Sequence, residues 1–353
     1  MLRTVLLLSF AATHAAAQSF VQTAQAVRIT GASPRLDGRL EEDIWRAIPP
    51  ATGFLQRDPD QGAPATQRTE VRFAYDEEAL WIGARMHSTS PREIRALVTR
   101  HDREGTSEQL IVSLDTHHDR RTAYTFAVTP ASVRIDYYHS SDNEDDQDFG
   151  FDPVWEAESR IDSLGWTAEM RIPFSQLRFS AAEVQTWGVN ILRSVPARNE
   201  ESYWSLIRRD EPGWASRMGT LEGVRGIRPS RRIEILPYVA VDSRLKSRVD
   251  LDDPFARRHE IDARLGADLK MGLGPSFTLD VTLNPDFGQV EADPAEVNLT
   301  AFETFFEERR PFFSEGAELL EGRGLFYSRR IGALPPGDPD ADYAERLEHT
   351  SIL

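Results

Sequence analysis

The sequence predicts an all-β chain: a β-sandwich followed by the first strands of a truncated outer-membrane β-barrel. Between about Ala26 and Gly226, apolar residues recur at every second position in short runs separated by turn residues, which is typical of a sandwich. After Gly226 the alternating runs become longer and cleaner. Because no predicted strand is followed by a helix long enough to cross back over a sheet, a parallel α/β fold is excluded.

The first alternating region contains a hairpin and two short helical segments. One apolar run ends at Tyr75 and the next begins at Leu80, on either side of the turn at 76–78, which predicts two antiparallel strands. Helical spacing is brief and is limited to 40–47 and 173–177. The region is therefore expected to be almost entirely strands and turns.

Four tryptophans are expected in the core. Trp155, Trp166 and Trp187 share the apolar phase of their predicted strands, and burial is the ordinary use of a Trp with apolar neighbours on the same face. Trp45 is expected to pack from its short helix.

A change of composition near Gly226 predicts a domain boundary, with a sandwich at 18–226 and a second domain at 227–353. Alternating runs at 231–241, 260–271 and 276–284 have one apolar and one charged face. Strands of about 9–11 residues with this alternation form the wall of an outer-membrane barrel. A soluble antiparallel sheet with one wet face is the alternative. Because a closed barrel needs about eight strands, we expect the barrel to be truncated here.

The N-terminus has the three parts of a secretory signal peptide at 1–17. Arg3 is the basic part, 5–12 is almost wholly apolar, and Ala15, Ala16 and Ala17 form a cleavage site of small residues. We therefore expect an exported protein. No later run has the roughly 18 apolar residues of a membrane helix, so any membrane insertion would use strands.

Charge and cysteine content exclude several classes of function. With 41 Lys and Arg against 57 Asp and Glu, the net charge of −16 repels phosphate backbones, so nucleic acid is not an expected partner. The absence of cysteine excludes disulfides, thiolate metal sites and a Cys nucleophile.

Several segments carry a specific resemblance to a known family. Near the end of the chain they are NPDFGQVEADP at 284–294, NLTAFETFFEERRPFFSEG at 298–316 and LFYSRRIG at 325–332. Upstream they are DTHHDRRTAY at 115–124, DPVWE at 152–156 and GWTAEMRIPFSQLRF at 165–179. Together they closely resemble an outer-membrane family of unknown function whose N-terminal domain is similar to family 9 carbohydrate-binding modules.

The resemblance implies a jelly-roll-like sandwich attached to an outer-membrane barrel, with the sandwich periplasmic or surface-exposed. The implied function is non-catalytic binding or uptake of a polysaccharide or oligosaccharide at the cell envelope, with the barrel part in contact with membrane lipid. A transport or secretion barrel with the sandwich as a cap is one alternative, and the charged, Phe-rich stretch at 302–313 is its motivation. A hydrolase of O-glycosyl bonds in carbohydrate catabolism is the other, because family 9 modules accompany such enzymes.

No catalytic residue is predicted. Glycoside hydrolysis needs two carboxyl groups about 5–10 Å apart, one of them with a raised pKa. Glu156 and Glu169 lie on neighbouring predicted strands, but both are in the polar phase among charged residues. Enzyme activity is therefore not expected of this chain.

Sugar binding needs aromatic faces and planar polar groups, and five residues are candidates. Trp81 is out of phase with its apolar neighbours and lies near Arg85, although a second core between sheet and loop also explains its position. Trp214 follows a turn, and Tyr137 and Tyr138 precede an acidic loop. These five residues form the predicted ligand site.

Calcium is the one candidate cofactor, at Asp115 and Asp119. The adjacent His117 and His118 would point to opposite faces of a strand and cannot easily share one zinc ion. The acidic run at 142–148 is a second oxygen-rich cluster, for which a solvated loop is the alternative.

Overall fold

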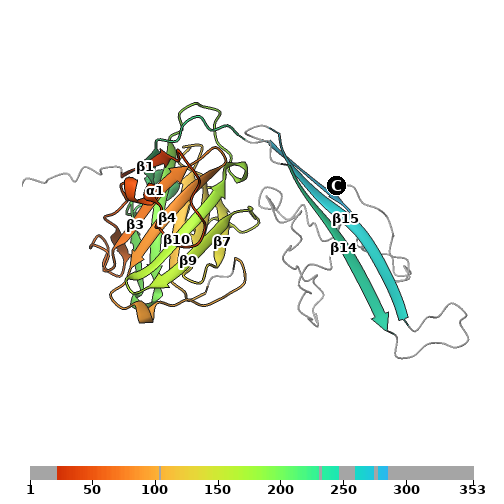
Figure 1. Cartoon of the computed structure of the whole chain (residues 1–353), viewed down its shortest axis with the longest axis horizontal. Helices are drawn as coiled ribbons and strands as arrows, with labels where there is room; N and C mark the ends of the chain where they lie inside the picture. Colours follow the sequence, from red (N-terminus) through yellow and green to blue (C-terminus); the bar gives the residue numbers. More distant parts are fainter. Residues whose placement is uncertain (1–21, 103–104, 230–232, 246–258, 274–276, 285–353) are drawn as a thin grey trace, which may run out of the picture.

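The computed structural model describes residues 22–102, 105–229, 233–245, 259–273 and 277–284 (Figure 1). The predicted signal peptide, the stretch at 302–313 and the family segments beyond residue 284 lie outside these ranges. The described elements are, in order, β1 (Thr23–Arg28), α1 (Asp43–Ala47), β2 (Leu55–Asp58), β3 (Thr69–Tyr75), β4 (Ala79–His87), η1 (Pro91–Glu93), β5 (Gln109–Asp115), β6 (Ala123–Val128), β7 (Arg134–His139), β8 (Gln147–Asp148), β9 (Glu156–Asp162), β10 (Gly165–Pro173), η2 (Phe174–Gln176), β11 (Trp187–Val195), η3 (Pro196–Arg198), β12 (Glu200–Tyr203), η4 (Ala215–Arg217), β13 (Gly219–Glu222), β14 (Ile233–Leu245), β15 (His259–Leu273) and β16 (Phe277–Leu283).

Strands β1 to β13 form one curled sheet that folds into two layers. The first layer has the order β1-β3-β4-β10-β9, and the second has the order β8-β7-β6-β5-β11-β13, with β12 and β2 continuing from β11. Strand β1 joins them, because Thr23–Gln25 pairs in parallel with β13 and Ala26–Arg28 pairs in parallel with β3. Figure 1 shows β4, β10 and β9 side by side with β7 behind them. The predicted all-β sandwich is confirmed, and β3 and β4 form the predicted hairpin.

The space between the two layers is filled by the apolar phase of each strand. Trp155, Trp166 and Trp187 are each 0 % exposed and belong to one large cluster with the apolar residues of β3, β4, β5, β6 and β11. The prediction that these three tryptophans form the core is confirmed. Burial of such large rings stabilises the sandwich.

Helix α1 packs on the outer face of the first layer, where Trp45 and Trp81 share a small second cluster. Trp45 is buried as predicted. The helix begins at Asp43, later than the predicted 40–47, because the preceding chain is held by a carboxylate of the sheet: Glu169 accepts backbone hydrogen bonds from Asp37 and Gly38. The predicted turn at 173–177 is the single 3-10 turn η2.

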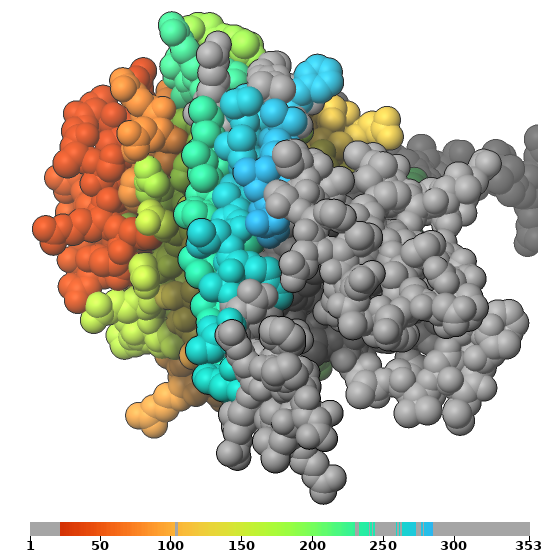
Figure 2. Space-filling model, turned by 90° about the vertical axis from the view of Figure 1, so that its right-hand side faces the viewer, coloured from red at the N-terminus to blue at the C-terminus, as the bar shows by residue number. Residues whose placement is uncertain are grey.

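Strands β14, β15 and β16 form a separate antiparallel sheet, drawn in green-cyan to blue in Figures 1 and 2. The strands contain 13, 15 and 7 residues, so the first two are longer than the sequence predicts. Tyr238 is paired with Gly266, and its ring lies where a Cβ at position 266 would be, so glycine is needed there.

The register of this sheet aligns the predicted apolar faces. Val239 pairs with Leu265, Leu269 with Val281, and Met271 with Leu279. The large apolar side chains of this sheet that are exposed have exposed fractions of 40–72 %; they are Ile233, Ile235, Leu236, Val239, Val241, Ile261, Leu265, Phe277, Leu279 and Leu283. The helices within the described part of the chain are too short or too polar to cross a membrane.

Candidate functional site

A pocket lies on the face of the second layer that is turned away from the core. Side chains at alternate positions of β5, β7 and β11 point to this face, opposite to the core residues between them. The connections after β7 and β12 complete its walls. The pocket is small, with a volume of about 30 Å³, and is lined by Ile111, Ser113, Tyr137, His139, Glu144, Gln147, Asn190, Leu192, Tyr203 and Trp214.

Aromatic rings form one wall of the pocket. The rings of His139 and Trp214 stack with centroids 3.8 Å apart, and Tyr137 meets His139 edge-on at 5.2 Å. Tyr137 and His139 reach the same face because they are two positions apart on β7. The wall thus combines two large rings with one imidazole.

His139 is a buried, neutral acceptor in this wall. Burial lowers its pKa to about 4, although a hydrogen bond to the Asn143 carbonyl oxygen works in the opposite direction. Because a carbonyl oxygen can only accept, Nδ1 carries the proton and Nε2 carries the lone pair. Among the described residues Nε2 is buried and has no hydrogen-bond partner. A ligand hydroxyl that donates to Nε2 would satisfy it.

The acidic loop at 142–148 positions Trp214. Asp142 accepts hydrogen bonds from the backbone N–H groups of Trp214 and Ser216 and from the Ser216 hydroxyl, at 2.7–2.9 Å. Gly213 precedes Trp214 with φ +88°, and a Cβ there would lie 2.4 Å from Ser216 Oγ. The acidic run at 142–148 is a candidate cation cluster by its sequence. In the structure one of its acids, Asp142, caps the turn that carries the Trp214 ring.

A second set of charges closes the pocket on the side of β12. The Tyr203 hydroxyl donates to Glu144, which also pairs with Arg57. Arg57 lies 4.9 Å above the Tyr203 ring and pairs with Glu201 at 2.5 Å. Burial and the nearby Glu144 raise the pKa of Tyr203 well above its ordinary value, so its hydroxyl stays protonated. This network holds Tyr203 in the pocket wall.

Asn190 fixes the chain that follows β12. Its side-chain amide donates to the Ser205 carbonyl at 2.9 Å, and its side-chain oxygen accepts from the Ser205 N–H at 3.0 Å. This reciprocal pair mimics a backbone ladder and holds the start of the segment that leads to Trp214.

Of the five predicted ligand residues, the structure brings Tyr137 and Trp214 together in the pocket, and the other three lie elsewhere. Tyr138 points to the opposite face of β7, where its ring packs on Tyr124 at 5.1 Å. Neighbouring residues of a strand face opposite sides, so Tyr137 and Tyr138 cannot share a site.

Trp81 and Arg85 belong to the first layer, away from the pocket, so they do not join Tyr137 and Trp214. Trp81 is 4 % exposed, packs with Trp45 beneath α1 and donates its indole N–H to Asp76 at 2.8 Å. Arg85 pairs with Asp162 at 2.5 Å. The second core that the sequence allowed is the correct explanation of Trp81.

Asp115 and Asp119, the predicted calcium pair, cap a turn. The Asp115 oxygens accept the N–H groups of Asp119 and Arg120 at 3.1 and 2.8 Å. The Asp119 oxygens accept from Arg121 and Thr122. Because N–H donors point at both carboxylates, capping of the turn accounts for this pair of aspartates without an ion.

Glu156 and Glu169 have separate structural roles. Glu169 is fully buried and accepts the Trp45 indole N–H at 2.9 Å, together with the two backbone bonds from Asp37 and Gly38. Burial raises the pKa of Glu169 to about 7. The sequence placed this residue on the polar face of its strand, and the structure shows that its surroundings are less polar than that position indicated. Glu156 is exposed and pairs with Arg171 at 3.7 Å. Neither lines the pocket.

Sequence reasoning missed the polar residues of the pocket. His139 could have been found from its spacing, two positions after Tyr137 on the same strand. Glu144 lies in the acidic run, but nothing local marks it as a partner of Tyr203 and Arg57. Asn190 sits among the core residues of β11 with no local signal.

Fold and pocket together define a β-sandwich with a small, aromatic-walled pocket on its outer face. Residues 229–352 match the model of a family described as a domain of unknown function, DUF5916. No curated protein sequence matches the chain.

Solved structures similar to this chain include family 9 carbohydrate-binding modules, as the resemblance in the sequence predicted. One from Caldicellulosiruptor kristjanssonii, in complex with glucose, has 13 % identity and a TM-score of 0.41, with 57 % of this chain and 96 % of that chain covered. The same kind of module in complex with cellotriose has 13 % identity, a TM-score of 0.41 and coverage of 59 % and 100 %. A putative carbohydrate-binding protein from Bacteroides uniformis has 15 % identity, a TM-score of 0.43 and coverage of 57 % and 98 %.

Proposed function

We propose that the sandwich is a non-catalytic carbohydrate-binding domain that holds a glycan at the cell envelope, for retention or uptake. The observation that carries this proposal is the pocket itself. Trp214, Tyr137 and Tyr203 line it together with the polar side chains of His139 and Gln147. Rings that cover the C–H face of a sugar, beside groups that bond its hydroxyls, are what a saccharide site requires.

The chemistry of the polar groups fits a neutral, hydroxyl-rich ligand. His139 Nε2 is an acceptor, and Gln147 carries both a donor and an acceptor. Glu144 is already paired with Arg57 and Tyr203, so the pocket presents little unpaired charge to a ligand. A volume of about 30 Å³ admits a hydroxyl group or a water molecule and not a whole sugar ring, so the glycan would lie across the mouth of the pocket.

The proposal includes a place in the outer membrane for the part of the chain after the sandwich. Strands β14 and β15 are longer than the 9–11 residues that cross a bilayer as a tilted strand, and their aligned apolar face is exposed. An apolar surface of this extent is costly in water, whereas lipid would cover it. The sandwich would then be periplasmic or surface-exposed.

Glycan binding is tested with the full chain and three single variants. We expect the wild-type chain to bind one or more members of a panel that includes glucose, cellotriose and soluble polysaccharides, by calorimetry and affinity electrophoresis. Trp214→Ala should weaken binding at least about tenfold, since stacked rings contribute most to such sites. Gln147→Ala should weaken it less.

Arg85→Ala is the matched control, because Arg85 was a candidate from the sequence and lies in the other layer. It should bind like wild type. A folded wild-type chain that binds no member of the panel would contradict the proposal, and so would a folded Trp214→Ala chain with wild-type affinity.

Membrane placement is tested separately by expressing the chain in a Gram-negative host and fractionating the envelope. We expect it in the outer-membrane fraction, and cleavage by protease added to intact cells would distinguish surface exposure from a periplasmic position. Recovery in the soluble periplasm alone would overturn this part of the proposal.

A further inference from the structure

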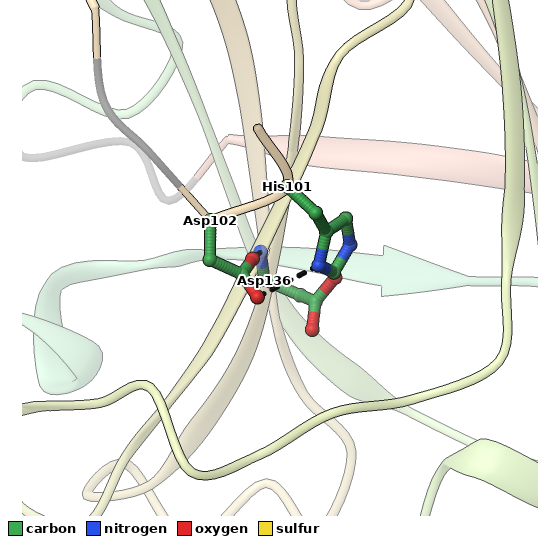
Figure 3. A group of neighbouring side chains, drawn as sticks. All are labelled: His101, Asp102 and Asp136. Atoms are coloured by element: carbon green, nitrogen blue, oxygen red, sulfur yellow. Dashed lines mark hydrogen bonds and ion pairs between the residues drawn. The ribbon is translucent and has the colours of Figure 1, made fainter. Parts of the chain in front are cut away.

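Three ionisable side chains meet where the connection from β4 to β5 approaches β7. Figure 3 shows His101, Asp102 and Asp136 pointing toward one another. His101 Nδ1 lies 2.8 Å from Asp102 Oδ2, and His101 Nε2 lies 3.2 Å from Asp136 Oδ1. Each residue offers one ligand atom within 4.8 Å of the others, and within the described ranges this is the one such group found.

Each carboxylate is held in place through its Oδ1 atom. Asp136 Oδ1 accepts the indole N–H of Trp155 at 2.7 Å, and Asp102 Oδ1 accepts the backbone N–H of Asp136 at 3.0 Å. Such outer partners orient the ligands of metal sites and leave the second oxygen of each carboxylate for the ion. Asp136 Oδ2 is in that situation, whereas Asp102 Oδ2 contacts His101 Nδ1 at 2.8 Å, a contact that the ion would replace.

Asp136 supplies an independent observation that points to a ligand. Its side chain is 0 % exposed, and Oδ2 has no hydrogen-bond partner among the described residues. A buried carboxylate oxygen without a donor or a cation is costly. A cation between Asp136 and His101 would satisfy it.

We propose that His101, Asp102 and Asp136 bind a divalent transition-metal ion of the zinc class. With a neutral imidazole the three side chains carry a formal charge of −2, which a divalent ion neutralises. The imidazole nitrogen favours zinc and related metals over calcium and magnesium, which take oxygen ligands. Three protein ligands leave further positions for solvent, which reaches the site because the His101 side chain is 37 % exposed.

The role of the ion would be structural. His101 and Asp102 belong to the connection that leads from the first layer to the second, and Asp136 belongs to β7 of the second layer. The ion would hold this connection against β7 by binding side chains from both. Without metal, a proton on His101 makes the same link, since its bonds to the two carboxylates raise its pKa to about 10. Metal binding therefore displaces that proton.

The site is tested on the full chain, without an affinity tag, by titration with Zn²⁺ and with Ca²⁺. We expect one Zn²⁺ per chain, bound at least tenfold more tightly than Ca²⁺. His101→Gln and Asp136→Asn should each weaken Zn²⁺ binding at least about tenfold, and Asn at 136 can still accept the Trp155 indole bond. His117→Gln is the matched control: His117 is exposed and also has aspartates near it, at 115 and 119, and its loss should leave affinity unchanged.

X-ray absorption at the zinc edge of the wild-type chain gives a second measurement that needs no variant. We expect one imidazole and otherwise oxygen ligands. Absence of stoichiometric zinc, a zinc spectrum with no imidazole, unchanged affinity in folded His101→Gln, or a preference for Ca²⁺ would each overturn the assignment.

Discussion

At the scale of single residues, burial decides the protonation state of two groups with very different neighbours. Glu169 is surrounded by N–H donors and still has its pKa raised to about 7 by burial. His139 stacks on Trp214 and has its pKa lowered to about 4, also by burial. In both cases the neutral form is favoured inside the sandwich, as desolvation requires.

Glu169 makes the stability of the sandwich depend on pH. Its folded pKa of about 7 is above the value of 4.5 for an unperturbed carboxyl, so the folded state holds the proton more tightly. Stability therefore falls as pH rises from about 4.5 to 7, by up to roughly 3 kcal/mol. We expect Glu169→Gln to lack this contribution in urea unfolding between pH 4.5 and 8. Glu156→Gln, which changes an exposed acid, should keep it; parallel curves for wild type and Glu169→Gln would contradict the prediction.

His139 makes the opposite contribution at lower pH. Its folded pKa of about 4 is below the ordinary value of 6.5, so the unfolded state binds the proton more tightly. Stability is therefore lost as pH falls from about 6.5 to 4. A ¹H–¹⁵N spectrum should show His139 as the Nδ1–H tautomer from pH 8 down to about 5. Titration with a midpoint near 6.5 would show that the ring is not buried as described.

At the scale of elements, the connections build the site and the strands support it. Strands β5, β7 and β11 present alternate side chains to the pocket, but the turn at 210–213 and the acidic loop decide where Trp214 lies. The loop is tied to the turn by side-chain bonds that join residues 72 to 74 positions apart. Loss of these bonds should affect the pocket more than the core.

Replacing Asp142 tests this dependence. Asp142→Ala removes three hydrogen bonds to the turn, so we expect glycan affinity to fall at least fivefold and stability to fall by about 1–3 kcal/mol. Asp145→Ala removes an exposed acid from the same loop and serves as the control. Calorimetry and thermal unfolding give the two readouts. Wild-type affinity in Asp142→Ala would show that Trp214 is positioned without this cap.

At the scale of the whole molecule, the two sheets differ in how much apolar surface they expose to water. The sandwich buries both inner faces between its layers. The sheet of β14, β15 and β16 instead exposes ten large apolar side chains, nine of which, among them Leu265 and Phe277, lie on one face, while Leu236 lies on the other. A face of this kind lacks a covering layer among the described residues and favours association.

This difference predicts how two fragments behave. Residues 18–226 should express as a soluble monomer that melts cooperatively, because the fragment contains the layered core except for Ile227. Residues 227–353 should precipitate unless detergent is present, because of the apolar face and the unpaired strand edges. Size-exclusion chromatography and circular dichroism provide the measurements. A soluble, monomeric and folded 227–353 fragment would favour an ordinary soluble sheet over a membrane barrel.

Much of the architecture was predictable from the sequence, and the exceptions depend on contacts between residues that are far apart in the chain. The hairpin of β3 and β4, the three core tryptophans and the apolar faces of β14 to β16 follow from alternation. Strand β1, which pairs with both layers, was not predictable, since its partners lie about 50 and 200 residues away. Trp81 lies in a second core because α1 covers the outer face of the first layer, which phase along a strand does not show.

The alternation of apolar residues by itself determined which segments form strands and which face of each strand is apolar. It also determined that Tyr137 and Tyr138 point to opposite faces, because side-chain direction in a strand is set by local backbone geometry. Only the tertiary structure decided that Trp214 meets His139, that Asp142 caps a turn and that His101 meets Asp136. These residues come from different strands and connections, and their approach depends on how layers and loops pack, a property that no local period encodes.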